Sequence, residues 1–405
     1  MVEGLQGIQV IQTATVLAGP LAARLLADWG ADVIRVERPA SGDMSRQMAR
    51  GMVGGRPIPA AIDYVSENIN RAKKSITLDL SQPTGQQIMH RLLTGADVLV
   101  CNYRPRELER FKLAYETLSR LNPRLIVANL SGYGRSGPER DLPGYEGISY
   151  FSRSGVMHTL QVPGMPPPQY PIGMGDFSAG MVLAYGIMLA LFIRERTGVG
   201  QEVDASLFNS GVYALSNDIA GTLVSGQERE KVAREDVLNP LANYYETQDH
   251  RWVRIGIVQP DLYWSQFCRA IAREDLEQDP RFASFEPRIE HHAALFAILV
   301  EVFKTRTYAE WKARLTAARL PWGPVQNLPE LIDDSQAKAN DMFIPMEHPV
   351  HGTMEVVNNP VRLGRTPLAP LRAAAQLGQH TEEVLLAHGY TWDDIARFKD
   401  EGVIW

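Results

Sequence analysis

The chain has 405 residues, of which 45% are hydrophobic and 22% are charged, and its net charge is −6. This is the composition of a globular protein with more than one structural unit, and an acidic balance argues against a nucleic-acid-binding protein. The two cysteines, Cys101 and Cys268, can form no disulfide framework, so the sequence favours a cytoplasmic location.

The first 140 residues alternate between strand and helix patterns. Short apolar, β-branched runs predict strands over 7–12, 31–37, 75–80, 97–102 and 125–130. Apolar residues at helical spacing predict helices over 20–29 and 85–93. Strands that alternate with helices of about ten residues indicate parallel βαβ units. We therefore expect an α/β fold with a Rossmann-like parallel sheet in a large domain.

The turn that opens the first predicted helix reads Leu17-Ala18-Gly19-Pro20, so it carries no Gly-x-Gly-x-x-Gly fingerprint. The chain also has no Gly-Lys-Ser/Thr phosphate loop. Both observations argue against a dinucleotide dehydrogenase and against a P-loop enzyme.

Basic residues gather in the loops of this first region. Arg38 and Arg104 directly follow predicted strands, and loops at the carboxyl ends of parallel strands line the ligand crevice. Further basic residues of these loops are Arg71, Lys73, Lys74, Arg106 and Arg110. The group predicts an anion site, with a phosphate as the first choice. The alternative is that Lys73 and Lys74 only solvate a surface loop.

A single carboxylate lies in a glycine-rich turn. Residues 173–180 read Gly-Met-Gly-Asp-Phe-Ser-Ala-Gly, and Asp176 is the acid. The 17 uncharged residues between Asp176 and Arg194 are fewer than the about 20 that span a membrane, so they predict a buried core helix and no membrane segment. Asp176 is then either the N-cap of that helix or a reactive carboxylate at its edge.

The remaining chain changes in character. Strands are predicted over 201–208 and 250–258, helices over 261–273 and 289–319, and a small antiparallel sheet over 346–363. Helices follow over 381–388 and 392–399. We expect a large domain over 1–200, a smaller α+β domain over 201–370, and helices in 371–405 that return to the large domain.

The residue types around Asp176 suggest acyl transfer. A free aspartate has a pKa of about 3.9, so it is an ionised nucleophile, weak but adequate for a thioester. Tyr145 and Glu146 are possible companions, and a second acid would raise the pKa of Asp176; alternatively, Glu146 is a solvated loop carboxylate. His291 and His292 lack the i, i+4 partner of a metal site, so no metal is expected.

Motifs throughout the chain support a family assignment. The chain resembles the class III CoA-transferases, a superfamily that includes formyl-CoA and carnitine CoA-transferases and α-methylacyl-CoA racemases. The resemblance rests on Ala18-Gly19-Pro20, residues 30–39, 73–80, 102–105 and 131–134, Gly175-Asp176, and residues 194–201 and 378–382.

This resemblance implies an interlocked, ring-like dimer and a catalytic aspartate at Asp176. The aspartate would form a mixed anhydride with the donor acyl group and then an aspartyl-CoA thioester, with Tyr145 and Glu146 as active-site neighbours. The positions that match CoA-binding residues are Leu17, Ala18, Arg38, Asn70, Arg71, Ala72, Lys73, Asn102, Tyr103, Arg104 and Arg110.

Two departures from the formyl-CoA transferases argue against formate and oxalate as substrates. Leu17 replaces a glutamine, and residues 256–260 (Gly-Ile-Val-Gln-Pro) replace a tetraglycine loop. A more apolar wall suggests a bulkier acid. Residues 150–157 and 259–264 are most similar to the branch that uses succinyl-CoA and acids such as benzylsuccinate. That branch includes heteromers, so the partner would be a second copy or a homologous subunit.

Two other functions remain open on the sequence. Acyl-CoA racemases of the same fold carry a histidine where this chain has Tyr145, and a phenol with a pKa of about 10 is a poor base near neutral pH. A non-catalytic CoA-binding subunit would leave Asp176 idle.

Overall fold

The structure is a computed structural model that describes residues 4–50 and 62–405. The chain divides into two compact units, of which the first comprises Met1–Leu160, Pro168–Val224 and Ala339–Trp405. The second comprises Gln161–Pro167 and Ser225–Lys338.

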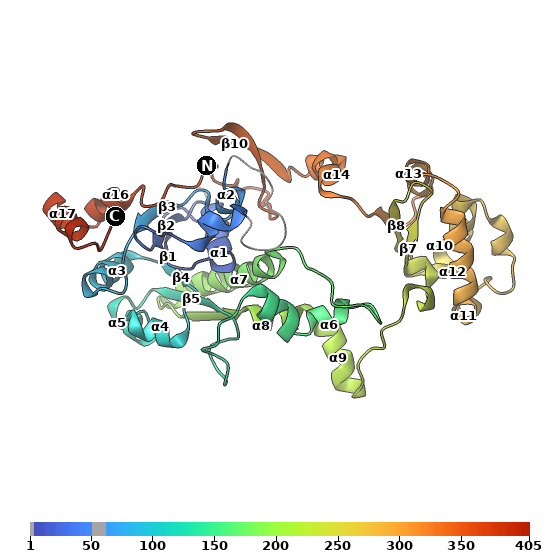
Figure 1. Cartoon of the computed structure of the whole chain (residues 1–405), viewed down its shortest axis with the longest axis horizontal. Helices are drawn as coiled ribbons and strands as arrows, with labels where there is room; N and C mark the ends of the chain where they lie inside the picture. The colour runs from blue at the N-terminus through green and yellow to red at the C-terminus, as the bar shows by residue number, and fades with distance from the viewer. Residues whose placement is uncertain (1–3, 51–61) are drawn as a thin grey trace. The chain divides into compact units, whose positions relative to one another are not determined.

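A six-stranded sheet forms the centre of the first unit (Figure 1). It confirms the predicted parallel sheet and adds β6 as a sixth strand. All its strands pair in parallel, in the order β3-β2-β1-β4-β5-β6. The strands are β1 (Gln9–Gln12), β2 (Asp32–Glu37), β3 (Lys74–Thr77), β4 (Val98–Cys101), β5 (Ile126–Ser131) and β6 (Glu202–Ser206). The order reverses between β1 and β4, and such a switch point opens a crevice at the carboxyl ends of the two strands.

Helices cover both faces of this sheet because neighbouring strand residues point to opposite sides. Val10 of β1 packs with one set of helices and Ile11 with the other. The Val10 side holds α1 (Ala18–Ala27), α6 (Val156–Leu160), α7 (Met174–Thr197) and α8 (Leu207–Ala214). The Ile11 side holds α3 (Pro83–Gly95), α5 (Tyr115–Leu121), α16 (Thr381–Ala387) and α17 (Trp392–Asp400). The C-terminal helices therefore join the first unit.

The long apolar helix α7 is buried along one side. Ala179, Leu183 and Ile187 are completely buried against the sheet, whereas Tyr185 and Phe192 are 71% and 61% exposed. The sequence predicted a core helix, but only the side that faces the sheet is covered. Among the described helices, α7 alone is long and apolar enough to cross a membrane by length and composition.

Residues 201–370, expected as one domain, are divided between the units. Strand β6 pairs with β5 at the edge of the large sheet, because Val127 N–H bonds to the carbonyl of Gln201 and the ladder continues from there. The hairpin of β10 (Phe343–His348) and β11 (Gly352–Val357) forms the predicted antiparallel sheet, but it belongs to the first unit. Its Val357 carbonyl accepts a hydrogen bond from Arg71 at 2.7 Å.

The second unit is a small α+β structure. Strands β7 (Tyr244–Glu246), β8 (Trp252–Ile255) and β9 (Trp322–Pro324) form an antiparallel sheet. Its core contains Phe267, Phe303 and Trp311, all completely buried. The helices of this unit are α10 (Pro260–Ile271), α11 (Phe285–Glu290), α12 (His292–Phe303), α13 (Tyr308–Ala317), α14 (Leu328–Asp333) and α15 (Ser335–Ala339).

The second unit also contains the short 3₁₀ helices Arg234–Asp236, Pro240–Ala242 and Glu274–Glu277. The remaining helices of the described residues belong to the first unit. They are the 3₁₀ helix Met44–Arg50, α2 (Tyr64–Asn70), α4 (Pro105–Arg110), the π-helix Gly147–Arg153 and α9 (Ser216–Ser225).

Candidate active site

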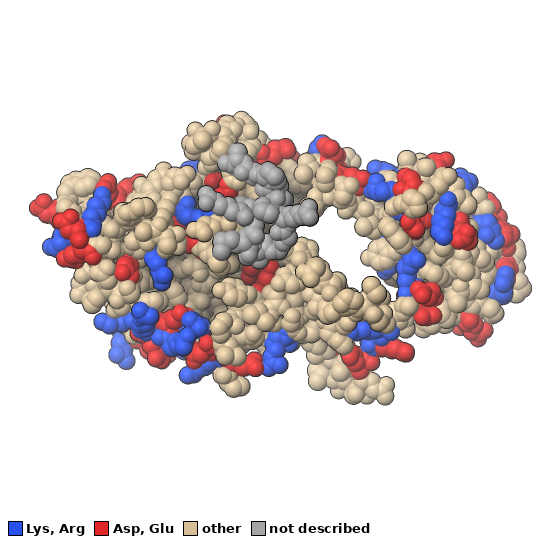
Figure 2. Space-filling view, in the orientation of Figure 1, with Lys and Arg blue, Asp and Glu red and all other residues tan. Residues whose placement is uncertain are grey.

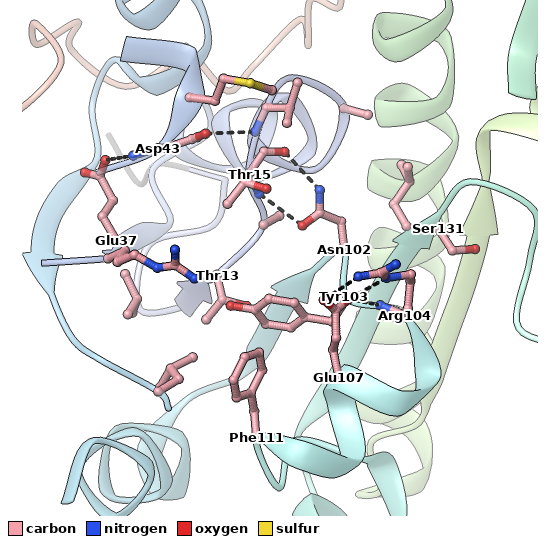
Figure 3. Close-up of a pocket in the computed structure, with 18 of the residues that line it drawn as sticks. Thr13, Thr15, Glu37, Asp43, Asn102, Tyr103, Arg104, Glu107, Phe111 and Ser131 are labelled. Carbon is pink, nitrogen blue, oxygen red and sulfur yellow. Dashed lines mark hydrogen bonds and ion pairs between the residues drawn. The ribbon is translucent and has the colours of Figure 1, made fainter. Parts of the chain in front are cut away.

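A cleft of about 710 Å³ opens at the switch point between β1 and β4. All its lining residues belong to the first unit. They come from the loops that follow β1, β2, β3 and β4, from the end of β5, from the start of α8, and from the segments around Tyr145 and Asp176. Asn102, directly after β4, accepts a hydrogen bond from the Thr15 N–H at 3.1 Å and donates one to the Thr15 carbonyl at 3.0 Å (Figure 3). The two strand ends are thus joined across the cleft.

Arginine side chains line part of this cleft. Arg38, Arg104 and Arg110 are among its lining residues. Glu107 holds the Arg104 guanidinium in a two-point ion pair with distances of 2.8 and 2.9 Å, and this hydrogen bonding raises the pKa of Arg104 (Figure 3). Figure 2 shows Lys and Arg, mixed with acidic residues, gathered over α4 and α5. A planar, fixed guanidinium suits the recognition of phosphate.

Asp176 also lines the cleft, and it is the third residue of α7. The N-cap is Gly173, whose φ of +84° is a left-handed conformation that favours glycine. The interpretation of Asp176 as the helix N-cap is therefore wrong. Its carboxylate lies in the first turn, and only 8% of the residue is exposed.

Glu146 provides the carboxylate that caps α7. It accepts hydrogen bonds from the N–H groups of Gly173 at 2.7 Å, Gly175 at 3.0 Å and Asp176 at 3.3 Å. Glu146 is 7% exposed, so the alternative of a solvated loop carboxylate is wrong. Neighbouring Tyr145 is 54% exposed and lines the cleft.

Burial raises the pKa of Asp176 to about 7, and the nearby charge of Glu146 adds to this shift. The expected effect of a second acid is thus present, although burial is the larger cause. A carboxyl group with a pKa near neutrality is a stronger base and nucleophile than an ordinary aspartate, and such a group in a cleft marks a candidate catalytic site.

Comparisons with known proteins agree with this arrangement. The model of CoA-transferase family III matches residues 5–381. The chain belongs to this family. The (R)-2-hydroxy-4-methylpentanoate CoA-transferase of Clostridioides difficile is 34% identical over 402 residues, which cover 99% of each chain. The succinyl-CoA–D-citramalate CoA-transferase of Chloroflexus aurantiacus is 32% identical over 99% of this chain and 98% of its own.

A comparison with solved structures supports the same family assignment. A CAIB/BAIF family protein from Brucella suis superposes with a TM-score of 0.83 at 27% identity, over 96% of this chain and 100% of the other. The resemblance predicted from sequence is confirmed. The protein is a family III CoA-transferase, an enzyme that acts on an acyl-CoA and a carboxylate.

The residues predicted to bind CoA fall into two groups in this family III chain. Seven of them line the cleft, namely Leu17, Ala18, Arg38, Asn102, Tyr103, Arg104 and Arg110. Asn70, Arg71, Ala72 and Lys73 are not among the lining residues. Arg71 is completely buried and pairs with Asp28, while Lys73 Nζ donates to Gln12 Oε1 and the Pro20 carbonyl at 2.7 Å each and to Asn70 Oδ1 at 3.1 Å.

Close backbone packing positions the Tyr145–Glu146 segment and the start of α7. A Cβ on Gly132 would lie 2.7 Å from the Gly144 Cα, and a Cβ on Gly175 would lie 2.7 Å from the Tyr150 ring. The π-helix Gly147–Arg153, which carries Tyr150, follows Glu146 directly, and π-helices are frequent at functional sites. The sequence does not indicate that Tyr150 packs against Gly175 and so helps to position the first turn of α7, because this contact exists only in the fold.

Two other predictions concern different parts of the chain. Residues 256–260, which replace the tetraglycine loop, join β8 to α10 in the second unit, and Val258 is 80% exposed. Among the described residues, no cluster of three or more His, Cys, Asp or Glu side chains could hold a metal ion. His291 and His292 each contact a backbone carbonyl of α11.

Proposed function

We propose that this enzyme transfers CoA from a succinyl-CoA-like donor to a carboxylic acid larger than formate or oxalate, with Asp176 as the nucleophile. One observation carries the proposal: a buried carboxyl group with a pKa of about 7 lines an arginine-bearing cleft of a family III chain. The carboxylate needs no separate base, because its ionised form is already abundant near neutral pH.

The reaction would proceed through four attacks that conserve the thioester. An Asp176 oxygen attacks the donor carbonyl carbon, the C–S bond breaks, and CoA leaves as the thiolate. The thiolate then attacks the aspartyl carbonyl of the anhydride, which releases the donor acid and leaves an aspartyl-CoA thioester. The acceptor carboxylate attacks this thioester and frees the thiolate, which attacks the acceptor carbonyl. Acceptor-CoA and the Asp176 carboxylate result, with no net proton transfer.

Glu146 and the cleft residues would support these steps. Glu146 keeps the first turn of α7 fixed through its three N–H contacts, so the position of Asp176 does not depend on substrate. Arg38, Arg104 and Arg110 would bind the CoA phosphates, and Tyr145 would contact the acyl group at the cleft wall. Excluding water from the anhydrides would preserve the energy of the thioester.

The acceptor acid is expected to be apolar or branched. Leu17 lines the cleft with an aliphatic side chain where formyl-CoA transferases carry a glutamine. The names of the two relatives above contain 2-hydroxy acids with four-carbon or longer chains, (R)-2-hydroxy-4-methylpentanoate and D-citramalate. We propose acids of this class as the first acceptors to test, with succinyl-CoA as the donor.

We also propose a dimer in the cytoplasm, either of two copies or with a homologous subunit. The apolar side of α7 that carries the exposed Tyr185 and Phe192 supports a partner chain, because large exposed apolar patches mark interfaces. The interlocked arrangement rests on the family resemblance alone.

A trapping experiment tests the nucleophile. The purified chain is incubated with succinyl-CoA and hydroxylamine and its intact mass is measured, beside D176A. An aspartyl anhydride or thioester would become a hydroxamate on Asp176, so the wild type should gain mass and D176A should not. A pKa of about 7 also suits acid–base catalysis, as in a racemase. Deuterium exchange at the α-carbon of a 2-methylacyl-CoA without trapping would favour that function, and neither signal would favour a non-catalytic subunit.

A further inference from the structure

Val16 has a backbone conformation that β-branched residues rarely adopt. Its φ is +70°, in the left-handed region, and it lies in the turn between β1 and α1 at the edge of the cleft. In this region the Cβ crowds the following carbonyl, and a second branch at Cβ adds to the crowding. Such a conformation persists only where the surroundings hold it in place.

Asp43 supplies one of the contacts that hold this turn. Its Oδ1 atom accepts a hydrogen bond from the Val16 N–H at 3.1 Å (Figure 3). Asp43 is itself fixed, because Oδ2 pairs with Arg35 at 2.8 Å and accepts from the Ser45 hydroxyl at 3.0 Å. The residue is only 3% exposed, so this charge-assisted hydrogen bond is protected from water.

The strained turn brings Leu17 next to Gly173, at the start of the helix that bears Asp176. Leu17 is 4% exposed and lines the cleft. A Cβ on Gly173, the N-cap of the helix that bears Asp176, would lie 3.5 Å from Leu17 Cδ1. The next residue, Ala18, also packs closely against α7, since a Cβ on Gly180 would lie 2.6 Å from the Ala18 carbonyl oxygen.

We propose that Asp43 is a positioning residue, which holds Val16 in the left-handed conformation and thereby keeps the Leu17 wall against the Asp176 turn. This inference rests on the proposed function, because that wall would orient the acyl group that Asp176 attacks. Asp43 itself contacts no reacting atom: its effect passes through the Val16 backbone. Glycine adopts a φ of +70° without strain, so replacing Val16 by glycine should remove the need for Asp43.

A double-mutant cycle tests the proposal with D43A, V16G and the double variant V16G/D43A. In the wild-type background, D43A should lower kcat for CoA transfer at least tenfold and change KM for the acyl-CoA less than threefold, since the cleft arginines are untouched. In the V16G background, the same substitution should lower kcat less than threefold. The Tm lost through D43A should likewise be smaller in the V16G background.

S45A is the matched control. It removes a hydroxyl from the same buried cluster and leaves the Val16 N–H contact with Asp43 in place. Its Tm should fall while kcat stays within twofold of the wild type. If D43A does not fold, D43N is compared with the wild type instead, because the amide oxygen keeps an acceptor for the Val16 N–H while the ion pair with Arg35 is lost. Its kcat should stay within threefold of the wild type, and a tenfold loss would overturn the positioning role.

The outcomes separate this inference from the proposed function. Equal effects of D43A on kcat and Tm in both backgrounds would overturn the positioning role. A tenfold loss of kcat in S45A would also overturn it, because disorder of the buried cluster would then be enough to explain the loss of kcat in D43A. If the wild type transfers no CoA at all, the proposed function fails, while the Tm cycle still tests whether Asp43 holds the Val16 turn.

Discussion

Glu146 accepts a hydrogen bond from the backbone N–H of Asp176 at 3.3 Å, while its charge raises the pKa of the Asp176 side chain. The Glu146 carboxylate thus accepts the hydrogen bonds of the N–H groups at the start of α7, and the Asp176 carboxylate lies near it in the first turn. The helix N-terminus stabilises negative charge, but here Glu146 uses those donors. Burial is the larger cause of the raised pKa of Asp176, and the charge of Glu146 beside it adds to the shift.

The variant E146Q tests this relationship. Without the charge of Glu146, the pKa of Asp176 should fall below about 7, although burial continues to raise it. Labelling of Asp176 by acyl-CoA requires the carboxylate, so the midpoint of its rate against pH should move to lower pH. An amide can accept at one oxygen only, so the helix start should lose about 1–3 kcal/mol of stability.

Single-turnover labelling between pH 5 and 9 gives the midpoint. The control is E139Q, which removes the charge of another loop glutamate, one that is partly exposed and paired with Arg153. An unchanged midpoint in E146Q would mean that Glu146 does not influence the ionisation of Asp176.

The variant D176N tests the raised pKa through stability. The folded state binds the Asp176 proton more tightly than the unfolded chain does, so wild-type stability falls as pH rises from about 4 to about 7. Asparagine has no such titration. D176N should therefore be more stable than the wild type at pH 8, by up to about 4 kcal/mol, and this difference should shrink towards pH 4. Denaturation at pH 5 and pH 8 measures it, and a pH-independent difference would contradict the shift.

Local patterns in the sequence were enough to predict the large sheet and the aspartate. The alternation that places Val10 and Ile11 on opposite faces is a property of neighbouring residues, and so is the glycine-rich turn around Asp176. The cap by Glu146 joins residues that are 27 to 30 positions apart, so no local pattern indicates it.

The features that the sequence does not indicate have the same origin. Residues 201–208 were predicted as a strand, but the sequence does not say that β6 completes the sheet beside β5. The basic residues Arg71 and Lys73 suggested a phosphate site. Their partners Asp28 and Gln12 are 43 and 61 positions away, and only the fold brings them together. The sequence shows where the charges lie along the chain, but the partner of each charge depends on the tertiary fold.

The variant G175A should disturb the catalytic turn. An added Cβ would lie 2.7 Å from the Tyr150 ring, so either the ring or the first turn of α7 must move. We expect a loss of about 1–3 kcal/mol of stability from overpacking and a kcat for CoA transfer at least tenfold lower. G95A is the helical control, because its Cβ would meet Gln9 Oε1 at 3.9 Å, an ordinary contact. Wild-type kcat in G175A would show that this turn tolerates displacement.

Arg38 is a candidate for CoA binding, and Arg106 is its matched control. Both are arginines in loops or helices that follow strands, but only Arg38 lines the cleft. R38Q should raise KM for the acyl-CoA about tenfold, equivalent to about 1.4 kcal/mol, and change kcat little. R106Q should leave KM within twofold of the wild type. Steady-state kinetics at 50 and 200 mM salt measure both, and equal KM values for R38Q and wild type would remove Arg38 from the CoA site.

Arg71 separates a structural role from the predicted contact with CoA. The side chain is completely buried, pairs with Asp28 at 3.3 Å and donates to the Val357 carbonyl at 2.7 Å. R71M should leave the Val357 carbonyl with only the longer contact from Arg24 at 3.4 Å and remove one partner of the buried Asp28. The expected cost is about 3–5 kcal/mol of stability, with an unchanged KM in the folded enzyme.

The control is K74M, since Lys74 forms longer and more exposed ion pairs at 3.4 and 3.6 Å. Exposed pairs contribute about 0–1 kcal/mol, so K74M should unfold at nearly the wild-type denaturant concentration. Denaturation and acyl-CoA kinetics on both variants show whether Arg71 has a structural role or contacts CoA. A raised KM in a stable R71M protein would restore Arg71 to the CoA site. A loss of stability alone would support a structural role, in which Arg71 holds the β10–β11 hairpin to the rest of the first unit.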